Sequence, residues 1–173
     1  MLNRHACAGW LVSVVLAIAP VTIIADTPEG TELPSVNALI PNFYYEDLDA
    51  AREWYVEKVG FSPLVDLGWV VIVEIGPGMQ LALVDGERGS LDPVDEKGAL
   101  LVIETDELEA WYQHMSGIDG IEWFQYEHDS DRYRLKHGIM EHREIEEFRV
   151  LDPEGYIIEF YRWKPDYRPE SRR

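Results

Sequence analysis

A single carboxylate stands inside an apolar stretch near the end of the chain. Glu159 lies within residues 156–163, and Ile158 and Phe160 flank it. In an extended strand these two neighbours point to the face opposite the carboxylate. A carboxylate is costly to bury unless it is paired, hydrated or bound to a metal ion. We therefore predict that Glu159 is either satisfied by nearby polar groups or serves as an acid, a base or an anchor for a cationic ligand.

The histidines could assist this carboxylate, but they form no recognisable motif. His114, His128, His137 and His142 follow no metal-ligand spacing. A loop folding over the site could bring His137 or His142 near Glu159, and whether these or His128 reach it stays open. Solvated histidines are the interpretation that we favour.

The elements that must position Glu159 form a repeated pattern. A turn at Asp152-Pro153-Glu154-Gly155 directly precedes its strand. Apolar alternation and helical spacing predict the order strand, helix and three strands, which then occurs a second time. The first copy comprises residues 36–45, 47–58, 61–69, 70–75 and 79–84, and the second comprises 99–104, 106–115, 121–128, 144–150 and 156–163. We interpret residues 85–98 as a solvated connector and residues 129–141 as a long polar loop.

The charge of the chain restricts its partners. The sequence has 33 acidic and 15 basic residues, which gives a formal net charge of −18. Such a surface repels nucleic acid phosphates and anionic lipids. We expect neither nucleic acid nor a membrane as a partner of the mature chain.

Residues 1–25 are typical of a secretory signal peptide. Arg4 gives a basic start, and residues 6–25 carry no charged side chain. We predict cleavage before Asp26, a polar lead-in at 26–35 and a periplasmic or secreted location, with an uncleaved membrane anchor as the alternative. Cys7, the only cysteine, lies in this segment. The mature chain would then have neither a disulfide nor a cysteine nucleophile.

Two motifs carry a family resemblance. The early one is Asp-Leu-x-x-Ala, Trp-Tyr and Val-Gly-Phe within residues 47–61, and the late one is Asp-Pro-x-Gly-Tyr-x-Ile-Glu-Phe at 152–160. Together they resemble the vicinal oxygen chelate superfamily, which includes glyoxalase I, bleomycin-resistance proteins and extradiol dioxygenases. The resemblance covers residues 36–163, with modules at about 36–85 and 99–163, and leaves 164–173 as a charged tail.

That resemblance implies an α+β fold. Two βαβββ modules would place curled mixed sheets around a shared cavity, either within one chain or across a homodimer. In metal-using members the ligands come from the first and last strands of each module. The resemblance places these positions at Ile40, Gln80, Ala99 and Glu159, of which only Gln80 and Glu159 could ligate. Without imidazole ligands a transition metal binds poorly, so we expect no cofactor, with a divalent metal on these two residues as the alternative.

Strand alternation assigns the cavity wall without a metal. The predicted lining is Asn42, Tyr44, Gln80, Ala82, Val84, Ala99, Leu101, Ile103, Ile157, Glu159 and Tyr161. The helices would cover the opposite face through Phe43, Leu81, Leu83, Leu100, Val102, Ile158 and Phe160. An apolar cavity with a few convergent polar groups is typical of a small-molecule site. The ligand-binding candidates are Asn42, Tyr44, Gln80, Glu159 and Tyr161, with Trp69 and Trp123 as further stacking surface or as ordinary core residues.

Three functions follow from these features. The first is an exported, glyoxalase-like domain that binds a small molecule without the metal of the family. The second is a lyase, isomerase or dioxygenase that uses Glu159 as its catalytic group. The third is a structural pseudo-enzyme domain within an envelope complex.

Overall fold

The computed structural model describes residues 34–124, 134–136 and 138–172. Residues Val36–Arg173 form one compact unit, which holds all the regular structure described below. The predicted signal peptide, and His128 and His137, lie outside the described residues. Within the described ranges no helix has the length and apolar character needed to cross a membrane.

The first module builds a four-stranded sheet, here called the first sheet. Its strands lie in the order β1-β4-β3-β2, with β1 parallel to β4 and the other pairs antiparallel. Asp47 begins the helix, because its Oδ1 accepts the N–H of Ala50 at 2.9 Å. The elements are β1 (Asn42–Tyr45), α1 (Leu48–Arg52), the π-helical continuation η1 (Glu53–Lys58), β2 (Ser62–Asp66), β3 (Val70–Gly76) and β4 (Met79–Asp85).

The second module repeats this plan in the second sheet. The main strands lie in the order β5-β10-β9-β8-β7, β6 pairs with β9, and β5 is parallel to β10. The elements are β5 (Leu100–Glu104), α2 (Leu108–Ser116), β6 (Glu122–Trp123), β7 (Arg134–Lys136), β8 (Ile139–Glu141), β9 (Ile145–Leu151), β10 (Ile157–Trp163) and the short 3-10 helices η2 (Pro165–Tyr167) and η3 (Glu170–Arg172). The end of the predicted polar loop therefore contains a hairpin, and β8 extends the sheet beside β9.

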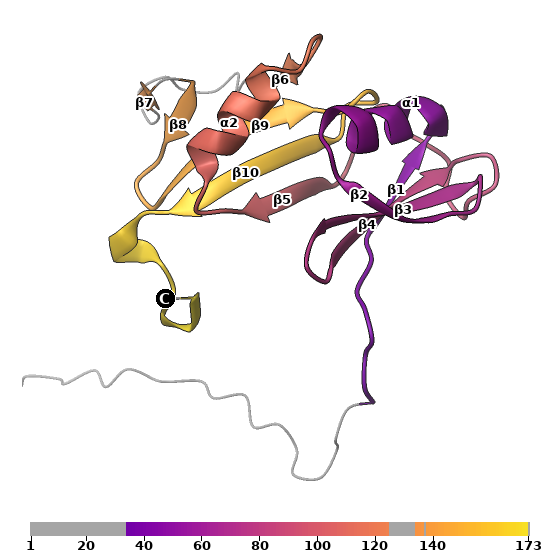
Figure 1. Ribbon diagram of the computed structural model, residues 1–173, viewed down its shortest axis with the longest axis horizontal. Coiled ribbons are helices and arrows are strands. Elements are labelled where there is room, and N and C mark those ends of the chain that lie inside the picture. The colour runs from indigo at the N-terminus through magenta and orange to yellow at the C-terminus, as the bar shows by residue number, and fades with distance from the viewer. Residues whose placement is uncertain (1–33, 125–133, 137, 173) are drawn as a thin grey trace, which may run out of the picture. The chain divides into compact units, whose positions relative to one another are not determined.

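The core lies between the helices and one face of each sheet. The helix α1 with η1 covers the first sheet, and α2 covers the second sheet (Figure 1). One continuous cluster of buried side chains includes Tyr45, Tyr55 and Leu83 from the first module and Met115 and Phe160 from the second. We call the opposite side of each sheet its helix-free face. The duplicated mixed sheets, curled but not closed, confirm the predicted α+β class.

One strand has the opposite phase to the one predicted. Leu101 and Ile103 pack against the core, whereas Leu100 and Val102 are 43% and 49% exposed. The register explains this, because Val102 lies beside Glu159 in the parallel β5–β10 pair. Residues 100–103 are all apolar, so the sequence contained no alternation to set the phase, and a shift of one residue reverses every side chain.

Candidate functional site

Glu159 lies on the helix-free face of the second sheet, as predicted. Its neighbours Ile158 and Phe160 are buried in the core on the other side, while the Glu159 residue is 7% exposed. Arg149 stands directly opposite it on β9, and the two side chains form an ion pair. The carboxylate is therefore paired with a guanidinium, one of the nearby polar groups that the sequence required.

A second carboxylate belongs to the same cluster. Glu147 is 1% exposed, and its Oε2 lies 3.3 Å from Nη2 of Arg149. Its Oε1 lies 2.9 Å from Nε2 of His142. We call these four residues, Glu147, Arg149, Glu159 and His142, the carboxylate cluster. Of the two described histidines, His142 is the one in this cluster, and it contacts Glu147 and not Glu159 directly.

The surroundings change the acidity of Glu159. Burial raises the pKa of its carboxyl, because desolvation disfavours the charged form. The negative charge of Glu147 raises this pKa further, and Arg149 only partly offsets the two effects. The Glu159 carboxyl therefore holds its proton to a higher pH than an ordinary glutamate does.

Apolar and aromatic side chains adjoin the cluster on the same face. Leu100 and Val102 of β5 are large, exposed neighbours of β10. Tyr161 donates a hydrogen bond of 2.8 Å to Oε2 of Glu104, and its ring meets that of Trp163 edge to face at 5.8 Å. The predicted site residue Tyr161 thus lies on the same face as Glu159, but its hydroxyl serves a neighbouring carboxylate.

The predicted residues of the first sheet lie in different surroundings. Asn42 is exposed and Gln80 is half-buried at the start of β4. The ring of Tyr44 is half-buried beneath the backbone of Gly89, which belongs to the loop after β4. The strand register therefore divides the predicted polar residues into two groups: Asn42, Tyr44 and Gln80 share the helix-free face of the first sheet, and Glu159 and Tyr161 share that of the second.

The two predicted tryptophans do not share a position. Trp123 pairs with Val150 and packs against Tyr112 and Phe148, which agrees with the alternative of an ordinary core residue. Trp69 precedes β3, is partly buried, and has the Arg88 guanidinium 6.0 Å from its ring centroid. The phase of a two-residue strand such as β6 could not be set from the sequence.

His114 has a structural role. Its Nε2 lies 2.9 Å from the carbonyl oxygen of Val59, and its ring meets Trp111 edge to face at 5.6 Å. It therefore connects α2 with the end of η1, while the residue stays exposed, as the sequence suggested.

Sequence reasoning missed Glu147 and Arg149, although a signal was available. The hairpin between β9 and β10 pairs Leu151 with Ile157, Arg149 with Glu159 and Glu147 with Tyr161. Counting outward from the predicted turn at 152–155 would have paired these residues and brought a guanidinium to the buried carboxylate.

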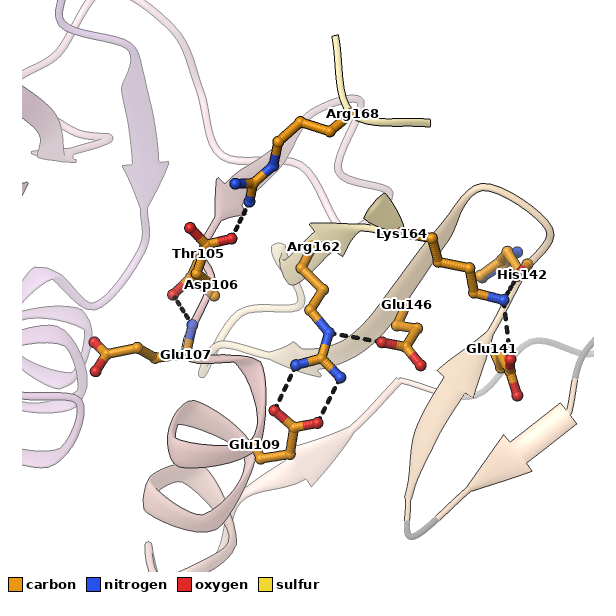
Figure 2. A network of polar contacts seen from close by, with 10 residues as sticks. All are labelled: Thr105, Asp106, Glu107, Glu109, Glu141, His142, Glu146, Arg162, Lys164 and Arg168. Atoms are coloured by element: carbon orange, nitrogen blue, oxygen red, sulfur yellow. Dashed lines mark hydrogen bonds and ion pairs between the residues drawn. The ribbon is translucent and has the colours of Figure 1, made fainter. Parts of the chain in front are cut away.

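A separate cleft of about 600 Å³ lies at the carboxyl end of β10. Figure 2 shows its centre, where Arg162 donates to Glu146 at 2.6 Å and to both oxygens of Glu109 at 2.5 and 2.7 Å. Lys164 donates to Glu141, and Arg168 pairs with Asp106. Each of these three cations has a carboxylate partner within the chain. The network fastens α2 and the residues after β10 to the second sheet, and it contains none of the predicted site residues.

The residues present do not fit the metal that the family resemblance implied. The first-strand position that lies beside Glu159 is Val102, which cannot ligate. The Glu159 carboxylate is already paired with Arg149, whose positive charge would repel a divalent cation. Among the described residues no group of three His, Cys, Asp or Glu side chains is placed to hold a metal ion.

Comparisons with known proteins agree with this architecture. Two solved structures of glyoxalase/bleomycin resistance protein/dioxygenase proteins are similar to this chain at 20% identity each. The one from Alicyclobacillus acidocaldarius covers 75% of this chain and 93% of its own (TM-score 0.53), and the one from Nocardioides covers 82% and 91% (TM-score 0.54). TioX from Micromonospora sp. ML1 is 16% identical and covers 73% and 98% (TM-score 0.51).

These likenesses show the fold alone, and among curated proteins none matches the chain. The model of one protein family matches residues 39–160, which span both modules and most of the chain. The duplicated parallel pairing of first and last strands follows the same division. The chain therefore belongs to the Glyoxalase/Bleomycin resistance protein/Dioxygenase superfamily.

Proposed function

We propose that this chain binds a small organic cation on the helix-free face of its second sheet, without a metal ion. The observation that carries the proposal is the carboxylate cluster, in which Glu147 and Glu159 share Arg149. Burial and the negative charge of Glu147 raise the pKa of Glu159. A ligand cation beside Glu159 would favour its ionised carboxylate.

The apolar neighbours give such a ligand a second kind of contact. Leu100 and Val102 are the exposed large apolar residues of β5, and they lie along β10 beside Ile157 and Glu159. Exposed apolar side chains next to a charged group are typical of a site for an amphipathic molecule. The substrate class that fits both is an amine or quaternary ammonium with an apolar or aromatic body.

Binding measurements with benzyltrimethylammonium, whose charge is permanent, test this proposal. The cation should bind with a Kd on the order of 1 mM or tighter, and neutral benzyl alcohol should bind more weakly. Because the ionised form of Glu159 is favoured by the cation, titration calorimetry in buffers of different ionisation enthalpy should show proton release. Equal binding of the two probes would overturn the proposal.

A matched pair of variants completes this experiment. E159Q should weaken the binding of benzyltrimethylammonium by about tenfold, since one charge-assisted contact is lost. E57Q removes an exposed carboxylate on η1 and should leave binding unchanged. If both variants bind as the parent chain does, the site is not at Glu159.

The acid–base character of the cluster supports an enzyme of the same superfamily as a second candidate. The raised pKa of Glu159 makes its carboxyl a stronger base than an ordinary glutamate, and His142 is connected to it through Glu147. Such a base would catalyse deuterium exchange at acidic C–H bonds of small carbonyl compounds, which NMR detects. E159Q should abolish this exchange if the chain is a lyase or isomerase.

The proposal includes export, because residues 1–25 have the composition of a secretory signal peptide. Mass spectrometry of the N-terminus of the protein from its native host would test the predicted cleavage before Asp26. A retained residue 1 would contradict it.

A further inference from the structure

We infer that residues 86–98, here called the cover loop, occupy the helix-free face of the first sheet and so determine where a ligand can bind. The loop takes the place of a ligand on that face, and the site is confined to the second sheet. This inference deepens the proposed function and rests on it for the ligand, although the loop's position can be tested without one.

The closest contact is made by Gly89. A Cβ added at this position would lie 2.7 Å from Cε1 of Tyr44, 2.8 Å from Cγ1 of Val84 and 2.9 Å from the carbonyl oxygen of Asp85. Contacts that short are not tolerated by packed atoms. The backbone of Gly89 therefore rests directly on two side chains of the helix-free face, and only glycine leaves room for it.

The beginning of the cover loop is held by backbone hydrogen bonds. The N–H of Gly86 donates to the carbonyl oxygen of Tyr45 at 2.9 Å, and the N–H of Gly89 donates to that of Asp85 at 2.7 Å. The side chain of Asp85 accepts the N–H of Glu87 at 2.9 Å. These bonds turn the chain back over the sheet immediately after β4.

The end of the cover loop is held by a buried lysine. The Lys97 side chain is 4% exposed, and its Nζ lies 3.4 Å from Oε2 of Glu154 and 4.8 Å from the ring centroid of Tyr156. The Tyr156 hydroxyl in turn lies 3.1 Å from the backbone nitrogen of Tyr44 on β1. An ion pair and a cation–π contact with little solvent therefore fasten the loop beside the strand that it covers.

The two modules consequently differ on their helix-free faces. Ala82 and Val84 of β4 are each 4% exposed although no helix covers that side. Leu100 and Val102 of β5 remain largely exposed on the equivalent face of the second sheet. Since burial on the first sheet is supplied by the chain itself, the surface over Ala82 and Val84 is not available to a ligand, whereas the surface over Leu100 and Val102 is.

Thiol labelling of single cysteines tests the position of the loop. With C7S as the background, V84C places a thiol beneath Gly89, V73C places one in the core, and V36C places one on the surface, where Val36 is 81% exposed. The V84C thiol should react with Ellman's reagent at least about 100-fold more slowly than the V36C thiol, because a covered site reacts only when it opens. Similar rates for these two variants would overturn the inference.

Displacing the loop gives the second half of the test. G89V should raise the labelling rate of the V84C thiol at least about tenfold, since the valine side chain cannot fit. G98V is the matched control, because a Cβ at Gly98 meets no atom within 4 Å, and it should change nothing. If G89V raised the labelling rate of the V73C thiol by the same factor, the protein would be unfolding as a whole. That result would contradict a cover that opens locally.

The outcomes separate this inference from the proposed function. Slow V84C labelling together with no binding of benzyltrimethylammonium would leave the cover loop standing and overturn the cation site. Fast V84C labelling together with Glu159-dependent binding would overturn the cover loop and leave the cation site standing.

Discussion

At the level of single residues, two buried carboxylates of β9 and β10 lie beside one guanidinium. Glu147 and Glu159 both pair with Arg149. Burial and the charge of Glu147 raise the pKa of Glu159, and Arg149 only partly offsets them. The positive charge of Arg149 beside Glu159 would repel a divalent metal ion at this position.

A pH dependence of stability follows from Glu159. Its pKa is raised in the folded state above the ordinary value of 4.5, so the folded protein binds this proton more tightly than the unfolded chain does. Below the ordinary pKa both states are protonated and no cost arises. As pH rises through the raised pKa, the folded state loses stability. E159Q should therefore show a smaller fall in the free energy of unfolding between about pH 4 and about pH 7 than the parent chain.

Urea unfolding followed across this pH range measures the difference. E57Q serves as the control, because the side chain of Glu57 is exposed. A pH dependence of E159Q identical to that of the parent would show that Glu159 ionises as an ordinary surface carboxyl.

At the level of elements, Asp152 joins the two modules. Its Oδ2 accepts hydrogen bonds from the hydroxyls of Tyr45 on β1 at 2.7 Å and Tyr55 on η1 at 3.1 Å. Its Oδ1 accepts the backbone N–H groups of Glu154 at 3.0 Å and Tyr156 at 2.8 Å. The turn that precedes β10 is thus formed and attached to the first module by one carboxylate, which is 4% exposed.

Removing this carboxylate should destabilise the protein far more than removing one of its donors. D152A leaves two buried hydroxyls and two backbone N–H groups without their acceptor, and we expect a loss of at least about 3 kcal/mol in the free energy of unfolding. Y45F removes one donor and should cost about 1 kcal/mol. Urea denaturation measures both, with D92A at an exposed position as the control. A cost for D152A no larger than that for Y45F would show that the turn holds without it.

For the whole molecule, the net charge of −18 acts on any charged ligand. An excess of negative charge attracts cations over a distance that salt shortens, from about 20 Å at about 20 mM NaCl to about 7 Å at about 200 mM. Binding of benzyltrimethylammonium should therefore weaken several-fold over this range, and that of benzyl alcohol should not. Equal affinity of the cation at both salt concentrations would show that only the nearby carboxylate cluster, and not the net charge of the chain, attracts it.

The sequence by itself determined the fold class and the location of the main carboxylate. Turn residues at 152–155 and helical spacing near residues 47 and 106 are local signals, so the duplicated βαβββ order could be predicted from them. Glu159 was identifiable because a charge between Ile158 and Phe160 breaks an apolar strand. These features depend on neighbours in the chain, and the structure places them as expected.

Only the tertiary structure decided the phase of β5 and which faces of the sheets are covered. The phase of β5 depends on its pairing with β10, since four successive apolar residues carry no alternation. Residues 86–98 cover Val84 through a backbone contact at Gly89. Contacts of this kind are set by packing between distant residues, whereas the pairing of Arg149 with Glu159 could have been counted outward from the turn at 152–155.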